Sequence, residues 1–425
     1  DACPTNMHAP EYIRSIYEGN FEQAVEWIYE TNPFAHVCGR VCTHCCESAC
    51  SLSHGTEAED EANSSSQNKA PIAIRWLKRF AMDNVPKTKI KAIARKNKVR
   101  TKSGKKVAIV GAGPAGLTAA YDLVKKGHQV QVFEAMPKGG GMTRYGIPNY
   151  RLPEDMLDRD IEVIESIGVK IEYNCRIGQD ISLEQLNQDY DAVALGLGLQ
   201  DGRSTRIPGS ENENVHRAVE LLRKIPLLEK FDIPRSAIII GGGNVAMDIA
   251  RSLARLQQQQ YQKVDVTVSA MEQLGASFLA DPEEVKESIE EGISILDSRG
   301  PKECVIDESG KLTGLKTVKV LSIFDQGGRF SPKYDEDDLI FHPAEIVVEA
   351  IGQMANISLL GEQITEALEW NRGRIKVDAS GKTSLDWLWS AGDMVNGPDV
   401  VHAVKDGHTV AASIDLYLSD NSQQK

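Results

Sequence analysis

The sequence has no apolar run close to the ~20 residues that a helix needs to cross a bilayer, so we expect no membrane-spanning segment. Basic residues are not in surplus either. Lys and Arg number 48 against 61 Asp and Glu, and the resulting net charge of −13 opposes binding to nucleic acid or to anionic membranes. No basic segment followed by an apolar one opens the chain, as a secretory signal would, and we expect a cytoplasmic protein.

The composition is not depleted in hydrophobic residues, at 41%, or in charged residues, at 26%, which excludes a chain that is disordered throughout. The first 85 residues combine helical patterns with six of the eight cysteines. Residues 86–106 are strongly basic and predict a solvated linker. From Val107 onward, strands, glycine turns and helices alternate in the pattern of parallel α/β sheets.

One helical pattern lies between the cysteines and the basic segment. The run PIAIRWLKRFAMD predicts a helix over residues 71–83. Its spacing places Ile72, Trp76, Leu77 and Phe80 on one face.

The run KKVAIVGAGPAGLTAAYDLVKKGHQVQVFE contains a strand, a glycine turn, a helix and a second strand. Gly111 allows the tight turn, Gly113 lets the backbone approach a pyrophosphate, and Gly116 lets the helix pack closely on the sheet. The free N–H groups at the start of the helix attract phosphate. Glu134 ends the second strand, where a carboxylate can accept both hydroxyls of an adenosine ribose. The motif predicts a dinucleotide site.

A second motif, SAIIIGGGNVAMDIARSLARL, repeats this arrangement with Gly241, Gly243 and Ala246 in the same three roles. Two dinucleotide sites in one chain suggest a flavin at one and a nicotinamide at the other. Glu272 follows the next strand, where a 2′-phosphate would call for arginine, so NADH is favoured over NADPH. The predicted NAD contacts are Gly241, Gly243, Asn244, Val245, Ala246 and Glu272.

Cysteine is scarce beyond residue 50. Only Cys175 and Cys304 occur there, far apart in sequence and remote from the glycine motifs. The paired redox cysteines of a disulfide reductase are therefore missing, and both residues are expected to be buried apolar groups.

These motifs, with CGRVC, CESAC, GGGMTRYGIPNYRLP, EAIGQ and SAGDMVNGPDVVHAV, resemble the small-subunit family of bacterial glutamate synthase. That family includes the flavoprotein arms of dihydropyrimidine dehydrogenase and of electron-bifurcating transhydrogenases. The resemblance implies FAD on the first glycine motif, with Asp393 binding its ribitol and the segment at 398–401 starting a helix beneath the flavin ring. The predicted FAD contacts are Gly111, Gly113, Pro114, Ala115, Gly116, Glu134, Gly141, Arg144, Gly392, Asp393, Val400 and Val401.

The expected fold is therefore α/β, with two Rossmann-like dinucleotide-binding domains, the NAD domain inserted into the FAD domain, preceded by a small helical iron–sulfur domain. The boundaries that we predict are 1–85 for the iron–sulfur domain, 86–106 for the basic linker, 107–230 and 344–425 for the two parts of the FAD domain, and 231–343 for the NAD domain.

The N-terminal cysteines follow the pattern Cys38-x3-Cys42-x2-Cys45-Cys46-x3-Cys50, which suits ligation of a [4Fe–4S] cluster. A structural zinc site and disulfides are the alternatives. By resemblance, Cys3, Cys42 and Cys46 serve one cluster and Cys50 another, and the predicted ligands are Cys3, Cys38, Cys42, Cys46 and Cys50. Lys78 stands where relatives supply a Gln or Glu ligand, and Cys38 or Cys45 could substitute for it. We expect one cluster, and a second stays open.

The function that these motifs predict is electron transfer between NAD(H) and a partner oxidoreductase through FAD and [4Fe–4S], with no catalytic side chain assigned. The expected partners are catalytic or ferredoxin-like iron–sulfur subunits of a larger complex, such as glutamate synthase, a 2-oxoacid oxidoreductase, or a sulfur- or hydrogen-metabolising complex. The alternatives are a stand-alone NAD(P)H-dependent flavin oxidoreductase and a binding protein with inactive cofactor sites.

Overall fold

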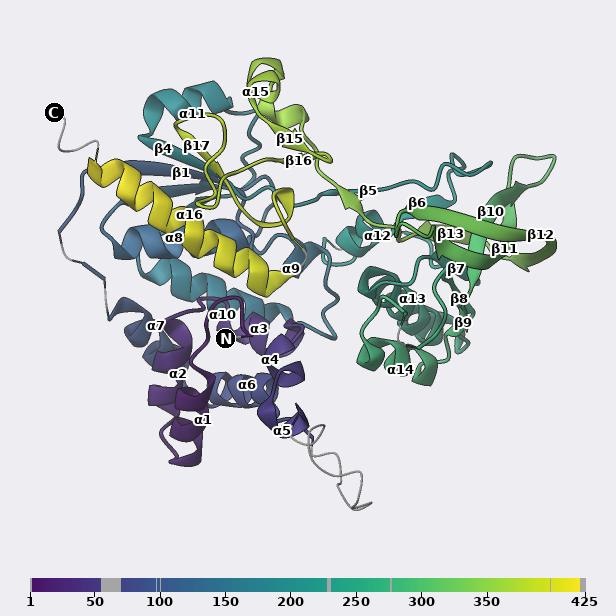
Figure 1. Cartoon of the computed structure of the whole chain (residues 1–425), viewed down its shortest axis with the longest axis horizontal. Helices are drawn as coiled ribbons and strands as arrows, with labels where there is room; N and C mark the ends of the chain where they lie inside the picture. Colours follow the sequence, from purple (N-terminus) through teal and green to yellow (C-terminus); the bar gives the residue numbers. More distant parts are fainter. Residues whose placement is uncertain are drawn as a thin grey trace. The chain divides into compact units, whose positions relative to one another are not determined.

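The structure is a computed structural model that describes residues 2–54, 70–96, 98–99, 101–227, 231–275, 277–397 and 399–420 (Figure 1). The chain forms two compact units. Unit 1 comprises Asp1–Arg144, Asn149–Leu199 and Ala355–Lys425, and unit 2 comprises Tyr145–Pro148 and Gln200–Met354. Each unit contains a parallel five-stranded sheet, so the predicted α/β class with one dinucleotide fold inserted in another is confirmed.

The N-terminal part of unit 1 is helical. Its helices are α1 (Ala9–Tyr17), α2 (Phe21–Tyr29), α3 (Ala35–Val41), α4 (Cys45–Ser48), α5 (Ser51–His54), α6 (Ile74–Asn84) and α7 (Lys87–Arg95). Asn20 caps α2 by accepting a hydrogen bond from the backbone N–H of Gln23 at 3.2 Å. The buried hydroxyl of Tyr12 on α1 donates to the carbonyl of Ile74 at 2.8 Å, which fixes the start of α6.

The buried face of α6 differs from the predicted face. Trp76 and Phe80 are 49% and 45% exposed, and Ile72 precedes the helix and is 38% exposed. The residues that α6 buries are Ile74, Lys78, Ala81 and Met82. The face that α6 buries is set by its close crossing with α3, because a Cβ at Gly39 of α3 would lie 3.1 Å from the Cα of Arg79 on α6.

The segment 86–106, predicted as a solvated linker, begins with a helix in the structure. Helix α7 (Lys87–Arg95) covers most of its first half. Ile90 and Ala94 are buried on its inner face. Lys87 and Lys91 form ion pairs with Glu162 at 2.6 and 3.0 Å, so the basic residues neutralise acids of a neighbouring helix instead of being only solvated. Asn97 and Arg100 lie outside the described residues.

The sheet of unit 1 has the order β17-β4-β1-β2-β3, with every neighbouring pair parallel. Its strands are β1 (Lys106–Val110), β2 (Gln129–Phe133), β3 (Lys170–Glu172), β4 (Ala192–Leu195) and β17 (Leu388–Ser390). The other helices of the unit are α8 (Pro114–Lys125), α10 (Glu154–Ser166), α11 (Leu183–Asp189), α15 (Glu362–Ala367), α16 (Val400–Asp420), and the 3-10 turns η1 (Ser358–Leu360) and η2 (Gly392–Met394). α9 (Met142–Tyr145) ends at the unit boundary, and β15 (Trp370–Asn371) and β16 (Arg374–Ile375) form a short hairpin.

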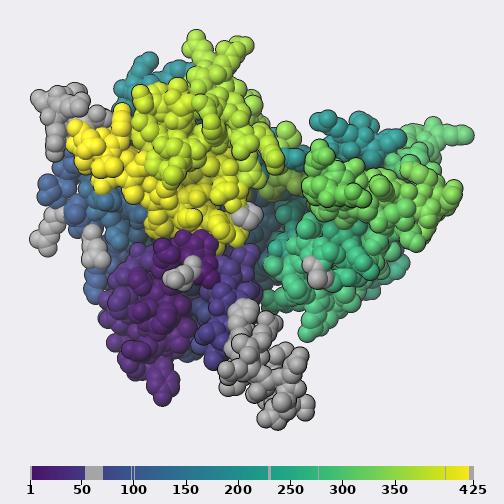
Figure 2. Space-filling model, in the orientation of Figure 1, coloured from purple at the N-terminus to yellow at the C-terminus, as the bar shows by residue number. Residues whose placement is uncertain are grey.

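Helix α16 packs tightly on α8 within unit 1. A Cβ at Gly407 would lie 2.5 Å from the carbonyl oxygen of Ala115, so the two backbones meet where no side chain intervenes. The helix also lies against the N-terminal helices, as the yellow and purple surfaces of Figure 2 show. There, His408 contacts the carbonyl of Thr31 at 2.9 Å through Nε2 and Asp122 at 2.6 Å through Nδ1.

A buried carboxylate of α10 joins the helical part to the first dinucleotide fold. Asp160 is fully buried and accepts hydrogen bonds from the backbone N–H groups of His36 and Val37, at 3.3 and 3.0 Å. Its Oδ1 atom also lies 2.7 Å from Nδ1 of His36. Asp160 thereby caps the N-terminus of α3, the helix that leads into the cysteine loop.

Unit 2 has its own parallel sheet, of order β6-β13-β7-β8-β9. Its elements are β5 (Asp201–Gly202), β6 (Val215–Arg217), α12 (Ala218–Lys224), β7 (Ala237–Ile240), α13 (Asn244–Tyr261), β8 (Val266–Ser269), α14 (Pro282–Glu290), β9 (Ser294–Leu296), β13 (Ile346–Glu349) and β14 (Gln353–Met354). An antiparallel sheet of β10 (Arg299–Ile306), β11 (Leu312–Phe324) and β12 (Phe330–Pro343) completes it.

The predicted limits of the NAD domain, 231–343, are too narrow. The strands β6 and β13, assigned by sequence to the FAD domain, pair with each other, and β13 also pairs with β7 in unit 2. The chain enters and leaves the unit at β5 and β14, which pair antiparallel, so the inserted unit extends over 200–354. No helix in the described residues is long and apolar enough to span a membrane.

Candidate functional site

Of the three fingerprint glycines in the turn between β1 and α8, only Gly113 leaves space for a ligand beside its backbone. Gly111 has φ +102°, and a Cβ there would lie 2.5 Å from the carbonyl oxygen of Gly196. A Cβ at Gly116 would lie 2.1 Å from the carbonyl oxygen of Gly111. At Gly113 the nearest atom to a Cβ is 3.8 Å away, so this backbone stays accessible to a ligand. The turn fits a bound pyrophosphate.

Glu134 is held rigidly beside this turn. Its Oε2 atom accepts from the backbone N–H of Ala112 at 2.7 Å, and its Oε1 atom accepts from that of Met136 at 2.8 Å. Burial raises the pKa of Glu134 above its ordinary value, and the two backbone donors offset only part of that effect. The carboxylate lies at the carboxyl end of β2, where the sequence predicts a ribose contact.

Two other predicted FAD segments converge on the start of α8. A Cβ at Gly141 would lie 2.9 Å from the Cα of Gly113, and a Cβ at Gly392 would lie 3.1 Å from the Cβ of Ala115. Next to Gly392, burial raises the pKa of Asp393, and the cation of Arg374 opposes this shift. The structure thus brings together residues 111–116, 141 and 392–393, and a cradle of this kind fits a dinucleotide.

The remaining predicted FAD contacts differ in their surroundings. Pro114 is the first residue of α8. Val400 and Val401 form the first turn of α16, where Val401 is buried, and Pro398 lies outside the described residues. Arg144 is engaged elsewhere, because its buried guanidinium pairs with Glu154 at 3.0 Å and with Asp158.

The second glycine turn, between β7 and α13, repeats the pattern. Gly241 has φ +132°, and a Cβ there would lie 2.5 Å from the carbonyl oxygen of Ala350. At Gly243 no atom lies within 4 Å of a Cβ position, and Ala246, in the first turn of α13, is fully buried. The side chain of Asn244 exchanges two hydrogen bonds with Asp281, at 3.0 and 2.8 Å, which hold the following loop over the turn. Val245, next along α13, is half-buried.

Glu272 lies directly against this turn. A Cβ at Gly242 would be 2.8 Å from its Oε2 atom. Between Ser269 and Asp281 the sequence contains no Lys or Arg. The edge of the turn therefore presents a carboxylate and no cation from this loop, an arrangement that suits ribose hydroxyls better than a 2′-phosphate.

Four cysteines surround one cavity in the N-terminal helical part. The cavity has a volume of about 380 Å³. Its functional lining residues are Cys3, Tyr12, Cys42, His44, Cys45, Cys46, Arg75 and Lys78. Among these, Cys45 is absent from the predicted ligands, although its position in the cysteine run left it open as a substitute. A soft donor set of four thiols around a space of this size fits an iron–sulfur cluster.

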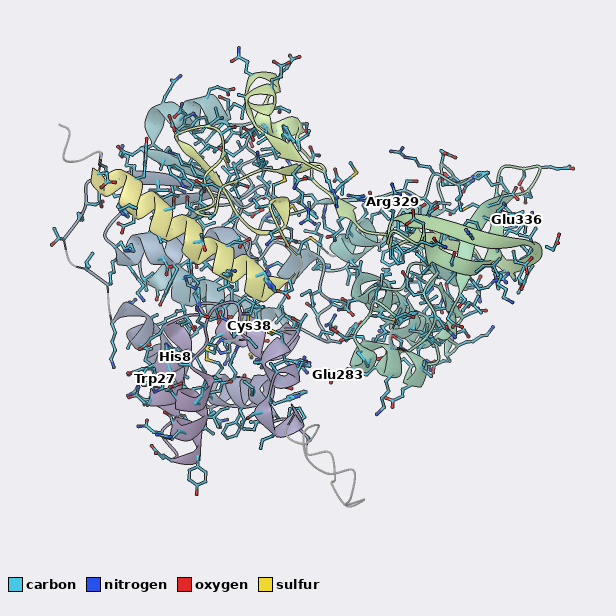
Figure 3. All side chains as sticks on the ribbon, viewed as in Figure 1. His8, Trp27, Cys38, Glu283, Arg329 and Glu336 are labelled. Carbon is cyan, nitrogen blue, oxygen red and sulfur yellow. The ribbon has the colours of Figure 1, made fainter. Side chains whose placement is uncertain are left out.

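The other two predicted ligands do not line this cavity. Cys38 is fully buried in the helical core (Figure 3), and burial raises the pKa of its thiol to about 12. Cys50 lies just after α4. No group of three or more His, Cys, Asp or Glu side chains in the described ranges is arranged to hold a single metal ion. The four thiols line the cavity without converging on a single point.

Local backbone geometry shapes the cysteine loop. His44 has φ +40°, in the left-handed region, and its N–H donates to Sγ of Cys42 at 3.4 Å. Burial raises the pKa of Cys42, and burial and the neighbouring Cys42 raise that of Cys46 to about 11. Ligation by Cys42 and Cys46 therefore has to displace the protons of both thiols.

One hydrogen bond connects the cysteine loop with the predicted flavin segment. The hydroxyl of Thr43 donates to Oδ2 of Asp399 at 3.1 Å. Asp399 immediately precedes α16, and its Oδ1 accepts from the backbone N–H of His402 at 2.9 Å. The loop that carries Cys42 and Cys45 thus contacts the N-terminus of the helix that packs on α8.

Comparison with protein families gives two matches. The pyridine nucleotide-disulphide oxidoreductase family matches residues 105–407. Residues 1–90 match the family described as dihydropyrimidine dehydrogenase domain II, 4Fe-4S cluster. The two matches together cover the three predicted cofactor regions.

Curated relatives extend over nearly the whole chain. The beta subunit of NADP(+)-dependent formate dehydrogenase from Moorella thermoacetica is 35% identical over 98% of this chain, which spans only 59% of that relative. The NAD-dependent dihydropyrimidine dehydrogenase subunit PreT of Escherichia coli is 36% identical over 98% of this chain and 90% of its own length. The glutamate synthase [NADPH] small chain of Halomonas elongata is 31% identical over 98% and 87%.

Among solved structures, FprA from Mycobacterium tuberculosis in complex with NADPH has the same fold over 75% of this chain and 86% of its own. The TM-score is 0.62 and the sequence identity is 19%.

Proposed function

The chain belongs to the pyridine nucleotide-disulphide oxidoreductase family, and from this membership we propose that it is an electron-transfer flavoprotein subunit. NADH donates a hydride to FAD, and the electrons leave singly through an iron–sulfur site to a partner oxidoreductase. The predicted resemblance to the glutamate synthase small-subunit family is confirmed by relatives that extend over almost the whole chain.

The observation that carries the proposal is the contact between Thr43 and Asp399. It joins the loop of the cysteine cavity to the first turn of α16, next to the segment that carries Asp393. A direct contact of this kind is what electron transfer between a flavin in the first dinucleotide cradle and an iron–sulfur group in the cavity would require. FAD supplies the conversion of a two-electron hydride into single electrons.

The residues of this chain have binding and positioning roles in the scheme. The turn at Gly113 and the carboxylate of Glu134 hold the FAD pyrophosphate and ribose. The turn at Gly243 holds the nicotinamide coenzyme, and Glu272 selects NADH by accepting from its ribose hydroxyls and repelling a 2′-phosphate. The cysteines of the cavity hold one [4Fe–4S] cluster.

The partner supplies the substrate chemistry. Relatives carry names of subunits, including a beta subunit, a small chain and PreT. We infer that the partner is a catalytic or ferredoxin-like iron–sulfur subunit of a larger complex, of the kind that oxidises or reduces small metabolites.

The cysteine distribution disfavours the alternative of a disulfide reductase. Cys175 and Cys304 are 6% and 2% exposed, and they belong to different units. None of the eight cysteines, all of which lie in the described residues, forms a disulfide. Neither buried cysteine offers a redox pair to a flavin.

The experiment that tests the proposal is anaerobic purification followed by analysis of FAD, iron and acid-labile sulfide. We expect stoichiometric FAD, about four irons per chain and bleaching of the flavin absorbance by NADH. A preparation with FAD but without iron would favour the stand-alone flavin oxidoreductase, and one without either cofactor would contradict both functions.

A further inference from the structure

Lys78 is an unusual residue in the wall of the cysteine cavity. It lies on the buried face of α6 and is only 5% exposed, while the aromatic neighbours Trp76 and Phe80 face solvent. Its side chain lines the same cavity as Cys42 and Cys46. Within the described residues no carboxylate forms an ion pair with it.

A buried ammonium without a partner is unfavourable, because it loses hydration and gains no opposite charge. The other cation of the cavity, Arg75, differs in this respect. Its side chain is only partly buried, and its Nη1 atom donates to the carbonyl of Cys42 at 3.4 Å. Lys78 lines the cavity together with Cys42 and Cys46, so an anionic group held by these thiols would lie beside its ammonium.

We propose that Lys78 is the counter-cation of the iron–sulfur group held by this cavity and that its charge raises the reduction potential of that group. The inference rests on the proposed function. Each transfer would bring one electron into the site from the reduced flavin and release one electron to the partner, so the charge of the site would change by one unit and return. The added electron makes an already anionic thiolate site more negative, and a fixed cation stabilises that state.

The test compares two substitutions in the full-length, iron-loaded protein. Lys78→Met removes the charge and keeps most of the length, and Lys78→Arg keeps the charge. The matched control is Lys89→Met on α7, a lysine that is 57% exposed and pairs with Glu22. The measurements are iron content and an anaerobic redox titration followed by EPR and visible absorbance.

In Lys78→Met we expect a more negative midpoint potential, so that the ratio of reduced to oxidised cluster at a fixed solution potential falls about tenfold. Lys78→Arg and Lys89→Met should keep this ratio within about twofold, because the first retains the charge and the second is screened by solvent. Loss of iron in Lys78→Met alone would also support the proposal, since the charge would then be needed to retain an anionic group.

Two results would overturn the inference. One is an unchanged potential in iron-loaded Lys78→Met, and the other is loss of iron from both Lys78 variants, which would assign the residue to ligation or packing. A wild-type protein that assembles no iron–sulfur group would instead overturn the proposed function, and this inference with it.

Discussion

The glycines of the two dinucleotide turns separate into those that the fold requires and those that leave room for a ligand. At Gly111, Gly116 and Gly241 a Cβ would collide with backbone atoms at 2.1–2.5 Å. At Gly113 and Gly243 it would meet no atom closer than 3.8 Å, and neither residue has a positive φ. Substitutions at the second pair therefore test binding without disturbing the fold.

Gly113→Ala should fold like the wild type and lose FAD affinity by at least about tenfold, because the methyl group occupies the path of the pyrophosphate. Thermal unfolding of the apoprotein and FAD content after dialysis measure the two effects. Gly243→Ala is the matched control, with normal FAD and a raised KM for NADH. Normal FAD content in Gly113→Ala would show that the flavin does not bind at this turn.

Coenzyme choice depends on Glu272. The wild type should have the lower KM for NADH, and Glu272→Ser combined with Met271→Arg should shift the ratio of kcat/KM values toward NADPH by about tenfold or more, since a carboxylate is replaced by a cation. Ala270 is unsuitable for the arginine because it is fully buried. Steady-state kinetics with both coenzymes provide the measurement, and a wild type that prefers NADPH would refute the role of Glu272.

For single residues, the sequence predicted the two glycine turns well. Each glycine of the fingerprint is required there either by a close backbone contact or by the space that a ligand needs. The sequence left Cys45 open as a substitute ligand and did not predict that Lys78 is buried. The burial of Lys78 depends on how α3 and α6 cross at Gly39, a tertiary contact that spacing along the chain does not encode. Arg144 was predicted near FAD from its motif, whereas its charge is satisfied by Glu154 and Asp158.

Among the elements, α3 depends on a cap from outside the helical part. Asp160 is fully buried and binds two N–H groups of α3 and the ring of His36. Asp160→Ala should destabilise the protein by about 3 kcal/mol, because it leaves buried donors without an acceptor. Chemical denaturation measures this, with the exposed Asp155→Ala on the same helix as the control. Equal stability of the two variants would show that the cap is dispensable.

The packing of α16 should depend on pH through His408. Burial by itself lowers the pKa of His408, but the hydrogen bond and charge of Asp122, together with the hydrogen bond to the carbonyl of Thr31, outweigh it and raise the pKa above the ordinary value. The stabilisation is complete below the unfolded pKa of ~6.5 and is lost as the pH rises through the folded value. The difference in Tm between wild type and His408→Gln should therefore be larger at pH 6 than at pH 9. A difference that is independent of pH, or one that persists in an Asp122→Asn background, would contradict this assignment.

Local composition predicted a linker where the structure has the helix α7. Ten basic residues without an acid between 87 and 106 predicted a linker. The structure pairs Lys87 and Lys91 with Glu162, and Lys89 with Glu22, so the compensating acids are distant in sequence. A local window of sequence does not contain such partners.

For the molecule as a whole, hydride transfer and the exit of electrons occupy separate groups of residues. The double variant Cys42→Ser, Cys46→Ser should lose iron, because a hydroxyl replaces a thiolate poorly, while FAD stays bound and NADH still reduces it. Delivery of electrons to the partner should fail, although a small dye that reacts with the flavin remains active. Anaerobic stopped-flow absorbance and iron analysis measure these outcomes.

Cys175→Ser, which changes a buried cysteine remote from the cavity, is the control and should keep its iron. If the double variant kept full iron and normal reduction of the partner, the cavity would not be the exit path. If a folded, FAD-loaded double variant lost the reaction with NADH, the two processes would not be separable.

The insertion of unit 2 has a consequence for synthesis on the ribosome. Strand β17 and helix α16 complete unit 1, yet they follow the inserted unit in the chain, and β17 pairs with β4 across that whole insertion. All the strands of unit 2 emerge before them, so unit 2 can reach its native state while the first sheet still lacks its edge strand. We therefore expect FAD to be captured late, after the last residues of α16 have left the exit tunnel.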